Sequence, residues 1–331
     1  MKLRTLTRMF GLVLCLAGLA ACREQTAGVG PGAAPTLTPT PRSTPLPAVP
    51  TAIPPGDEGN AIRMVIRPPG PKADAESAIE DFEAAVLGRS GIVIQVELVE
   101  RYAEALAALC ESSSGQTSVA WLNAPTYVAA RAQNCGAPAL EVEQGTRREA
   151  RTAEAGSIIV AADSNIRDVT GLRNKSWCRL GSEDFYSWLL PTLVLKASSL
   201  DITTAKSVTD YEDIPALVAA VAAGDCDAAG IPANALDAYA GAIGDAAEEI
   251  TVLTTTIEFP YAVLTIPVEV PLGKRLALVN DLAAIAEDDT EAVIMRSLLA
   301  QNALVPVNSD DLAEVESFMS STGLDFAQLG N

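Results

Sequence analysis

The chain of 331 residues contains no histidine, and aromatic side chains make up only 5% of it. Without an imidazole, Ser-His-Asp and Cys-His catalysis, histidine-ligated zinc and the usual general base near neutral pH are all excluded. With few aromatic rings, the core must be built from Ala, Val, Leu and Ile, a composition that suits an α/β protein. Carboxylate chemistry stays open in principle, but the missing imidazole argues against an enzyme, and we expect no cofactor and no metal.

Positive charge is also scarce: 23 Lys and Arg residues stand against 42 Asp and Glu residues, which gives a net charge of -19. A surface this negative repels the phosphate backbone of nucleic acids, and it does not dock on anionic lipid through electrostatic attraction. The charge balance therefore argues against nucleic acid as a partner.

A basic N-terminal head precedes an apolar run from Met9 to Ala21. At about 13 residues the run is shorter than the roughly 20 that span a bilayer, so residues 1–21 are predicted to be a secretory signal peptide. The run ends in Leu-Ala-Ala followed by Cys22, which resembles the lipobox of bacterial lipoproteins. The resemblance implies acylation of Cys22 and an extracytoplasmic protein that its lipid anchors to the cell membrane. An ordinary cleavage site with an incidental cysteine is the alternative.

Nine prolines lie between Pro31 and Pro55, both included, mixed with Thr, Ala and Ser. Such a segment has no apolar periodicity for a core, and it favours extended, partly polyproline II conformations. We expect residues 22–58, the lipidated cysteine included, to be a disordered linker between the anchor and the folded part.

From residue 60 onward, strand and helix patterns alternate. Short apolar runs and period-two patterns predict strands, and apolar residues at helical spacing predict helices. The predicted strands are 62–66, 92–98, 119–122, 157–161, 177–180, 228–231, 250–253 and 261–266. The predicted helices are 79–87, 102–109, 125–133, 188–198, 214–223, 233–239, 274–287, 291–301 and 310–319, the last with Ser309 as its N-cap. This order argues for a mainly parallel sheet covered by helices.

Six segments of this part resemble, in the same order, those of a known family. They are 102–106, 119–130, 166–176, 189–191, 223–228 and 304–307, of which 119–130 reads VAWLNAPTYVAA. The family comprises the substrate-binding proteins of phosphate, phosphite and phosphonate ABC transporters, which have the two-lobed type II periplasmic-binding-protein fold. The resemblance implies α/β lobes at 60–156 plus 260–331 and at 157–259, joined by a hinge of two crossover strands. It also implies a small-molecule solute in the cleft and an ABC transporter permease as partner, and we expect a monomer.

Four further cysteines lie in the folded part: Cys110, Cys135, Cys178 and Cys226. An even number in an exported chain favours disulfides, and four cysteines allow three pairings. A metal site of four cysteines is the rival interpretation, although no C-x₂-C spacing supports it. In the resembled fold, Cys110–Cys135 and Cys178–Cys226 would each lie within one lobe, so the resemblance favours this pairing.

One segment departs from the family. In that family, a Ser-Thr-Ser-Gly-like stretch binds the phosphorus oxyanion at a helix N-terminus. The aligned stretch of this chain contains Glu183 and Asp184 instead. Pro191 lacks an amide hydrogen and belongs in the first turn of a helix, which places the N-cap near Ser187. Two carboxylates facing the cleft would repel a phosphonate and favour a cation, an amine or a zwitterion. Alternatively, both carboxylates point to solvent and favour the helix dipole.

Ten residues are candidates for ligand binding. They are Tyr102, Asn123, Tyr127, Glu183, Asp184, Phe185, Tyr186, Ser187, Asp227 and Asn234. The aromatic rings would offer cation–π faces to a cationic solute, and the polar residues lie near strand ends and helix starts. A packed aromatic ring or a simple helix cap is the alternative at these positions.

The predicted function is that of an extracytoplasmic solute-binding lipoprotein of an ABC importer. By family resemblance the solute is phosphonate- or phosphate-like, and the two carboxylates make a cationic or zwitterionic solute the alternative. A different function for the same fold is a sensory or scaffold lipoprotein that contacts a membrane protein. A hydrolase that uses the two adjacent carboxylates is disfavoured, because such chemistry needs an opposed acid and base.

Overall fold

The computed structural model describes residues 52–70, 72–145 and 148–328. The predicted signal peptide 1–21, the predicted lipidation site Cys22 and most of the predicted linker lie outside the described residues. Of the linker, residues 52–58 are described, and Asp57 in this stretch forms an ion pair with Lys274. None of the helices in the described ranges has both the length and the apolar character needed to cross a membrane.

The first sheet has six strands in the order β11-β4-β10-β3-β1-β2. Its strands are β1 (Ile62–Ile66), β2 (Ile94–Leu98), β3 (Ser118–Leu122), β4 (Ala137–Glu143), β10 (Val263–Ile266) and β11 (Ala303–Pro306). The hydrophobic pattern did not predict β4, because this strand contains Pro138 and a buried acid, Glu141. We call the part of the chain around this sheet lobe one.

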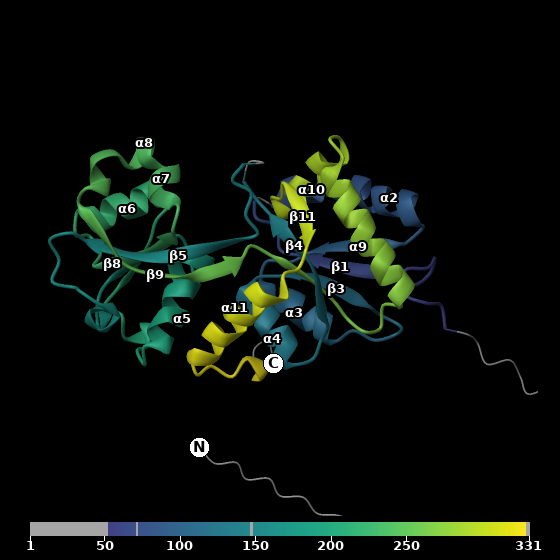
Figure 1. Ribbon diagram of the computed structural model, residues 1–331, viewed down its shortest axis with the longest axis horizontal. Coiled ribbons are helices and arrows are strands. Elements are labelled where there is room, and N and C mark those ends of the chain that lie inside the picture. The colour runs from purple at the N-terminus through teal and green to yellow at the C-terminus, as the bar shows by residue number, and fades with distance from the viewer. Residues whose placement is uncertain (1–51, 71, 146–147, 329–331) are drawn as a thin grey trace, which may run out of the picture. The chain divides into compact units, whose positions relative to one another are not determined.

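Helices cover both faces of the first sheet (Figure 1). On one face lie α2 (Ile79–Ser90), α9 (Leu272–Glu287) and α10 (Glu291–Leu299); on the other lie α3 (Tyr102–Cys110), α4 (Ala124–Ala132) and α11 (Ser309–Ser321). A short helix, α1 (Lys72–Glu76), precedes α2. Because side chains of a strand alternate between faces, Met64 packs against the first set of helices and Val65 against the second.

The second sheet has five strands in the order β7-β6-β8-β5-β9. They are β5 (Ala153–Ala161), β6 (Trp177–Arg179), β7 (Val208–Asp210), β8 (Ala228–Pro232) and β9 (Ile250–Pro260). The helices around it are α5 (Leu190–Ala197), α6 (Ile214–Ala222), α7 (Ala235–Ala238) and α8 (Ala240–Ile243), with a π-helical turn, η2 (Phe185–Leu189), directly before α5. Three 3₁₀ turns lie in the same part, η1 (Val169–Leu172), η3 (Ile202–Thr204) and η4 (Gly244–Ala247), whereas a fourth, η5 (Phe326–Gln328), packs against α4 of lobe one. We call the part around this sheet lobe two.

Both sheets are mixed, so the prediction of a mainly parallel sheet needs a correction. The strands of β-α-β units, β2-β1-β3 and β7-β6-β8, pair in parallel as expected. By contrast, β5 and β10 pair antiparallel with their neighbours. A parallel pair needs a long crossover connection, usually a helix, whereas β10 follows β9 of the other sheet after only Tyr261 and Ala262.

The strands β5 and β9 form the connection between the lobes. They pair antiparallel from Ala153 opposite Pro260 to Ala161 opposite Ile250, and they lead toward β4 and β10 of the first sheet (Figure 1). This is the hinge of two crossover strands that the resemblance implies. The residue boundaries predicted for the lobes, 60–156 plus 260–331 and 157–259, stay a prediction.

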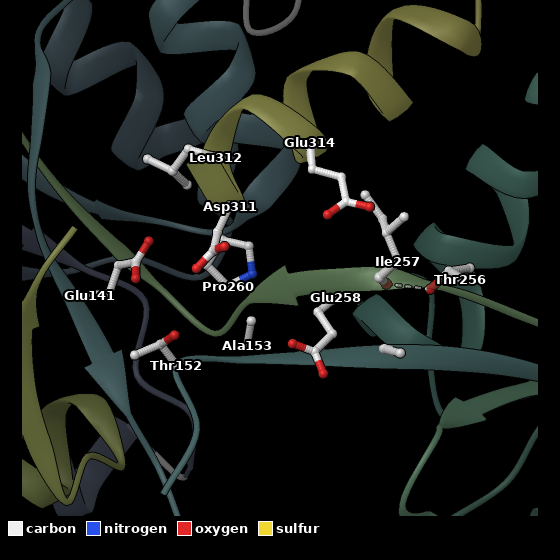
Figure 2. Close-up of a pocket in the computed structure, with 11 residues that line it drawn as sticks. Glu141, Thr152, Ala153, Thr256, Ile257, Glu258, Pro260, Asp311, Leu312 and Glu314 are labelled. Atoms are coloured by element: carbon white, nitrogen blue, oxygen red, sulfur yellow. Dashed lines mark hydrogen bonds between the residues drawn. The ribbon is translucent and has the colours of Figure 1, made fainter. Parts of the chain in front are cut away.

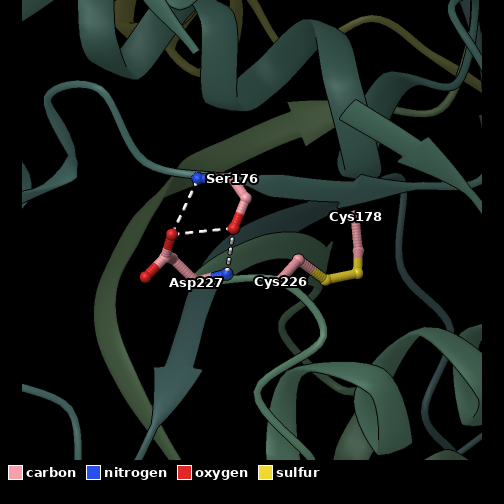
Figure 3. The surroundings of a disulfide bond; sticks show 4 residues. All are labelled: Ser176, Cys178, Cys226 and Asp227. Atoms are coloured by element: carbon pink, nitrogen blue, oxygen red, sulfur yellow. Dashed lines mark hydrogen bonds between the residues drawn. A yellow bond between two sulfur atoms is a disulfide. The ribbon is translucent and has the colours of Figure 1, made fainter. Parts of the chain in front are cut away.

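Both disulfides that the resemblance favours are present. Cys110 at the end of α3 is bonded to Cys135 after α4, with 4.6 Å between their Cα atoms. In lobe two, Cys178 on β6 is bonded to Cys226 just before β8, with 5.8 Å between the Cα atoms (Figure 3). The predicted pairing within each lobe is therefore confirmed.

The N-cap of the last helix differs from the prediction. Ser309 is the first residue of α11, and Asn308 is its N-cap, whose side-chain oxygen accepts a hydrogen bond from the backbone N–H of Asp310 at 3.1 Å. Asn and Ser are both good N-caps, so composition does not distinguish two neighbours of this kind, and the prediction of Ser309 is wrong by one residue.

Candidate functional site

A cavity of about 280 Å³, which we call the cleft cavity, is lined by residues of both lobes. Lobe one contributes Arg67, Tyr102 and Asn123, lobe two contributes Glu183, Asp184, Phe185 and Tyr186, and Pro260 and Tyr261 follow from the hinge. Six of the ten predicted ligand-binding residues are therefore together in one place, although they come from segments up to about 80 residues apart.

Two helices of lobe one begin at this cavity. Tyr102 is the first residue of α3, and Asn123 is the N-cap of α4. Asn123 is only 7% exposed, and its side-chain oxygen accepts hydrogen bonds from the N–H and the hydroxyl of Thr126 at 3.2 and 2.7 Å. In the described part of the chain its amide nitrogen has no acceptor. Because helix N-termini carry partial positive charge and free N–H groups, this wall favours an anion or another hydrogen-bond acceptor.

Arg67 adds a full positive charge to the same wall, and the sequence reasoning did not single it out. Its Nε donates a hydrogen bond to the backbone oxygen of Glu100 at 3.2 Å, and its guanidinium carbon lies 5.3 Å from the centre of the Tyr102 ring. Burial raises the pKa of Tyr102, and the charge of Arg67 opposes part of this increase. Arg67 directly follows β1, and Asn123 directly follows β3, the parallel neighbour of β1. Because parallel strands end at the same edge of a sheet, this pattern could have predicted that both residues lie at one edge.

The lobe-two wall is built by η2. Asp184 is its N-cap, and the Oδ1 of Asp184 accepts a hydrogen bond from the backbone N–H of Ser187 at 2.7 Å. The predicted N-cap near Ser187 is therefore wrong, because the π-helical turn starts earlier. Pro191 does lie in the first turn of α5, as its missing amide hydrogen requires. Ser187 is buried, and its hydroxyl accepts a hydrogen bond from the N–H of Leu180 at 2.9 Å.

The two carboxylates of this wall have different environments. The carboxylate of Asp184 is bonded to its own helix start, at a position where the resembled family binds an oxyanion. Glu183 is exposed at the rim of the cleft cavity. Phe185 packs edge-on against Tyr186 and Phe259, with ring centres 5.0 and 5.4 Å apart. The lobe-two wall is thus negative where the lobe-one wall is positive.

Two glycines allow η2 and α5 to lie directly on the second sheet. A Cβ atom at Gly230 of β8 would collide with the backbone oxygen of Tyr186, and one at Gly156 of β5 would collide with the side chain of Leu190. Only glycine permits so close an approach of a helix to a strand. The two glycines therefore fix where Tyr186 enters the cleft cavity.

Two tyrosines of the cleft cavity donate hydrogen bonds to one buried residue, Glu154. Glu154 on β5 is 6% exposed, and its Oε2 accepts a hydrogen bond from the hydroxyl of Tyr261 at 3.2 Å. The hydroxyl of Tyr186 donates to the backbone oxygen of Glu154 at 3.4 Å. Burial raises the pKa of both tyrosines, and the charge of Glu154 raises each pKa further. Both hydroxyls therefore stay protonated at neutral pH and hold the hinge strand against the cleft.

Four of the ten predicted residues do not line the cleft cavity: Tyr127, Ser187, Asp227 and Asn234. Tyr127 is 2% exposed, and its hydroxyl donates a hydrogen bond to Glu316 at 3.1 Å. Burial raises the pKa of Tyr127, and the Glu316 charge adds to the increase. Asn234 lines a neighbouring cavity of about 530 Å³ together with Glu154, which accepts a hydrogen bond from its backbone N–H.

Asp227 lies beside the lobe-two disulfide. Its Oδ2 accepts hydrogen bonds from the N–H and the hydroxyl of Ser176 at 2.8 and 2.7 Å (Figure 3). Burial acts to raise the pKa of Asp227, but the bonds from Ser176 and the charge of Lys175 outweigh it and hold this pKa below its usual range. The carboxylate thus joins the start of β6 to the start of β8.

A second cavity, of about 390 Å³, lies on the face of β5 opposite to Glu154, since Ala153 and Ala155 line it. Four carboxylates line this acidic cavity: Glu141, Glu258, Asp311 and Glu314 (Figure 2). Burial and the neighbouring charge of Asp311 raise the pKa of Glu141 to about 7, against a hydrogen bond from the backbone of Asn308. Within the ranges that the structure describes, no group of acidic, cysteine or histidine side chains is arranged to hold a metal ion.

Two lobes, a hinge of paired strands and a cavity lined from both lobes define the periplasmic-binding-protein class of solute-binding proteins. The family model described as ABC transporter, phosphonate, periplasmic substrate-binding protein matches residues 64–312. The chain belongs to this family, which confirms the predicted relationship and implies an extracytoplasmic location. No curated protein sequence matches the chain significantly.

Solved structures agree with this fold. XAC2383 from Xanthomonas citri, bound to chloride ion, aligns with a TM-score of 0.60 at 13% identity over 79% of this chain and 97% of its own. PhnD1 from Prochlorococcus marinus, in complex with methylphosphonate, gives 0.51 at 12% identity over 78% and 96%. A binding protein component of an ABC phosphonate transporter from Pseudomonas aeruginosa gives 0.51 at 14% identity over 82% and 88%. At these identities the likeness concerns the fold alone.

Proposed function

We propose that this chain captures a small solute in the cleft cavity and delivers it to the permease of an ABC importer, without a chemical step. The observation that carries the proposal is the cleft cavity itself, which is lined by residues of both lobes beside the hinge. A solute that contacts both walls stabilises the closed arrangement of the lobes, and this closure is what a transporter recognises.

The two walls favour a solute that carries charges of both signs. The lobe-one wall has Arg67 and the starts of α3 and α4, which attract an anionic group. The lobe-two wall has Glu183 and Asp184, which attract an ammonium group and repel a second anion. A zwitterion such as an aminoalkylphosphonate satisfies both walls, whereas a bare phosphonate dianion satisfies only one.

The membrane attachment belongs to the same proposal. Residues 1–21 would direct export, Cys22 would be cleaved free and acylated, and residues 22–58 would connect the anchor to the lobes. Two or more acyl chains make such attachment stable. The lobes would then work as a lipid-anchored monomer outside the cytoplasm.

Thermal unfolding of the full chain in detergent, with and without candidate solutes, tests the proposal. The panel holds inorganic phosphate, methylphosphonate, ethylamine, β-alanine and 2-aminoethylphosphonate. A bound solute at a hundredfold excess over its dissociation constant stabilises the protein by about 2.7 kcal/mol. We expect the zwitterions to raise the midpoint most, and absence of any shift across the panel would refute solute binding of this class.

A charge variant locates the cationic end of the solute. Glu183→Gln removes an exposed carboxylate at the rim, so it should weaken binding of 2-aminoethylphosphonate by about threefold and leave methylphosphonate unweakened. Glu212→Gln, an exposed residue of lobe two that does not line the cleft cavity, is the matched control. Equal effects of the two substitutions would argue against an ammonium group at Glu183.

A further inference from the structure

A smaller cavity of about 60 Å³, which we call the inner cavity, continues the cleft cavity into lobe one. The two cavities share Arg67, Tyr102 and Tyr261, and the inner cavity adds Trp121 and Gln144. A single water needs roughly 10–15 Å³ of such space, so the inner cavity holds a group of a few heavy atoms. It is large enough for a carboxylate or for the oxygens of a phosphonate.

Trp121 lines this cavity and carries a hydrogen-bond donor without a partner among the described residues. The residue lies on β3 and is 1% exposed, yet its indole Nε1 has no hydrogen-bond partner in the described part of the chain. An unsatisfied buried donor costs about 1–3 kcal/mol, so such groups are rare and call for an explanation. A ligand atom in the inner cavity that accepts this hydrogen bond would provide one.

Arg67 brings an unneutralised charge to the same cavity. Its side chain is half-buried, and no carboxylate in the described ranges lies within ion-pair distance of it. Its Nε–H donates a hydrogen bond to the backbone oxygen of Glu100. The other N–H groups of the guanidinium, which lies beside the Tyr102 ring, remain to donate to a ligand. By contrast, Arg63, which lies earlier on β1, forms an ion pair with Glu97.

The lining of the inner cavity is rich in donors and holds no carboxylate among the described residues. The indole N–H of Trp121 and the guanidinium of Arg67 only donate, and the hydroxyl of Tyr102 is protonated at neutral pH and can donate as well. Donors that gather around a half-buried site without a carboxylate beside them fit an oxyanion, because hydrogen bonds to a charged acceptor are the strong ones.

We propose that the inner cavity is the subsite for the oxyanion of the solute, held by Arg67, Trp121 and Tyr102 of lobe one. This inference rests on the proposed function and deepens it by fixing the orientation of the solute. The start of η2 in lobe two is not available to an oxyanion, because Asp184 already accepts the N–H of Ser187 there. The cleft therefore has its anion site in lobe one and its cation site in lobe two.

Isothermal titration of the full chain with 2-aminoethylphosphonate, β-alanine and methylphosphonate tests the role of Arg67. Arg67→Gln should weaken the binding of each compound that binds the wild-type chain by about 10- to 100-fold, the loss expected for a charge-assisted hydrogen bond. Arg63→Gln removes the same charge from β1, the strand directly before Arg67, at a position that does not line the cavity, and it should leave the affinity unchanged. Equal affinity of Arg67→Gln and wild type would overturn the subsite.

Trp121→Phe removes the orphaned donor and should weaken binding by about three- to tenfold. Trp177→Phe, at a tryptophan that is also 1% exposed but lies in lobe two away from the cavity, controls for the loss of packing. In spectra of ¹⁵N-labelled chain, the indole N–H signal that Trp121→Phe removes should move downfield on addition of the tightest-binding compound. A signal that stays in place would overturn the assignment of Trp121.

The outcomes separate this inference from the proposed function. If a compound binds the wild-type chain and its affinity is the same in Arg67→Gln and Trp121→Phe, the cleft binds solute but the inner cavity is not its anion subsite. If no compound of the panel binds the wild-type chain, the proposed function fails and the subsite fails with it.

Discussion

Glu141 offers the sharpest test of how charge is distributed around the hinge. It lies on β4, is 2% exposed, and lines the acidic cavity with Glu258, Asp311 and Glu314 (Figure 2). Burial and the charge of Asp311 raise its pKa from 4.5 to about 7. We predict that Glu141→Gln, which cannot ionise, is more stable than the wild type at pH 8.

The magnitude follows from the pKa. The difference between 4.5 and about 7 corresponds to about 3.4 kcal/mol at 1.36 kcal/mol for each pH unit. Because the cavity is open to water on one side, screening reduces this to on the order of 2 kcal/mol. For the roughly 275 residues of the two lobes, that amounts to an increase in Tm of about 3–4 °C at pH 8.

The direction in pH is fixed by linkage. Between pH 4.5 and 7 the folded protein binds the Glu141 proton and the unfolded chain does not, so stability falls as the pH rises through this window. Above about pH 7 the loss is complete and stays constant. The advantage of Glu141→Gln should therefore be small near pH 4.5, grow with pH and level off above 7.

Urea unfolding at several pH values from 4.5 to 8.5, followed by tryptophan fluorescence, measures this difference. Glu143→Gln is the matched control, since it removes a carboxylate two residues further along β4 that does not line the acidic cavity. The reasoning is refuted if Glu141→Gln and wild type have the same pH dependence, or if Glu143→Gln gives the same gain.

Three further substitutions have defined outcomes. Replacement of both Cys178 and Cys226 by Ala should lower the free energy of unfolding by about 4 kcal/mol, the chain-entropy value for a disulfide that joins residues 48 apart, measured in urea. Gly230→Ala should cost about 1–3 kcal/mol and also weaken solute binding in calorimetry, because its Cβ displaces the backbone of Tyr186 that lines the cleft cavity. Asp227→Asn should cost about 1 kcal/mol but leave solute affinity unchanged, because Asp227 bonds only within lobe two; an equal loss of affinity would contradict this role.

The sequence predicted the fold class and much of the site because these depend on local patterns. Period-two and helical spacings located most strands and helices, and the order of six short segments identified the family. The segment Glu183–Tyr186 was assigned to the cleft from the resemblance, and it does line the cleft cavity. The even number of cysteines predicted disulfides, and the two-lobed fold selected their pairing.

What the sequence did not predict depends on contacts between distant segments. The missing β4 is a strand that pairs with β10 and β11 from the other end of the chain, and its acid, Glu141, is buried. The antiparallel pairing of β5 and β10 with their neighbours arises because the chain passes between the lobes at the hinge, and no local pattern encodes it. Local propensity describes one segment at a time, so it cannot represent burial that a later segment imposes.

The sequence by itself thus determined the class of protein, its two lobes and the charge of the loop that would face the solute. Only the tertiary structure decided which charges meet. It put Arg67 and Trp121 at one cavity and left the indole N–H without a partner, and it turned Asp184 back onto its own helix. The reason is that hydrogen-bond partners and solvent exposure are properties of positions in space, and the affinity of a site for an anion or a cation is set by both.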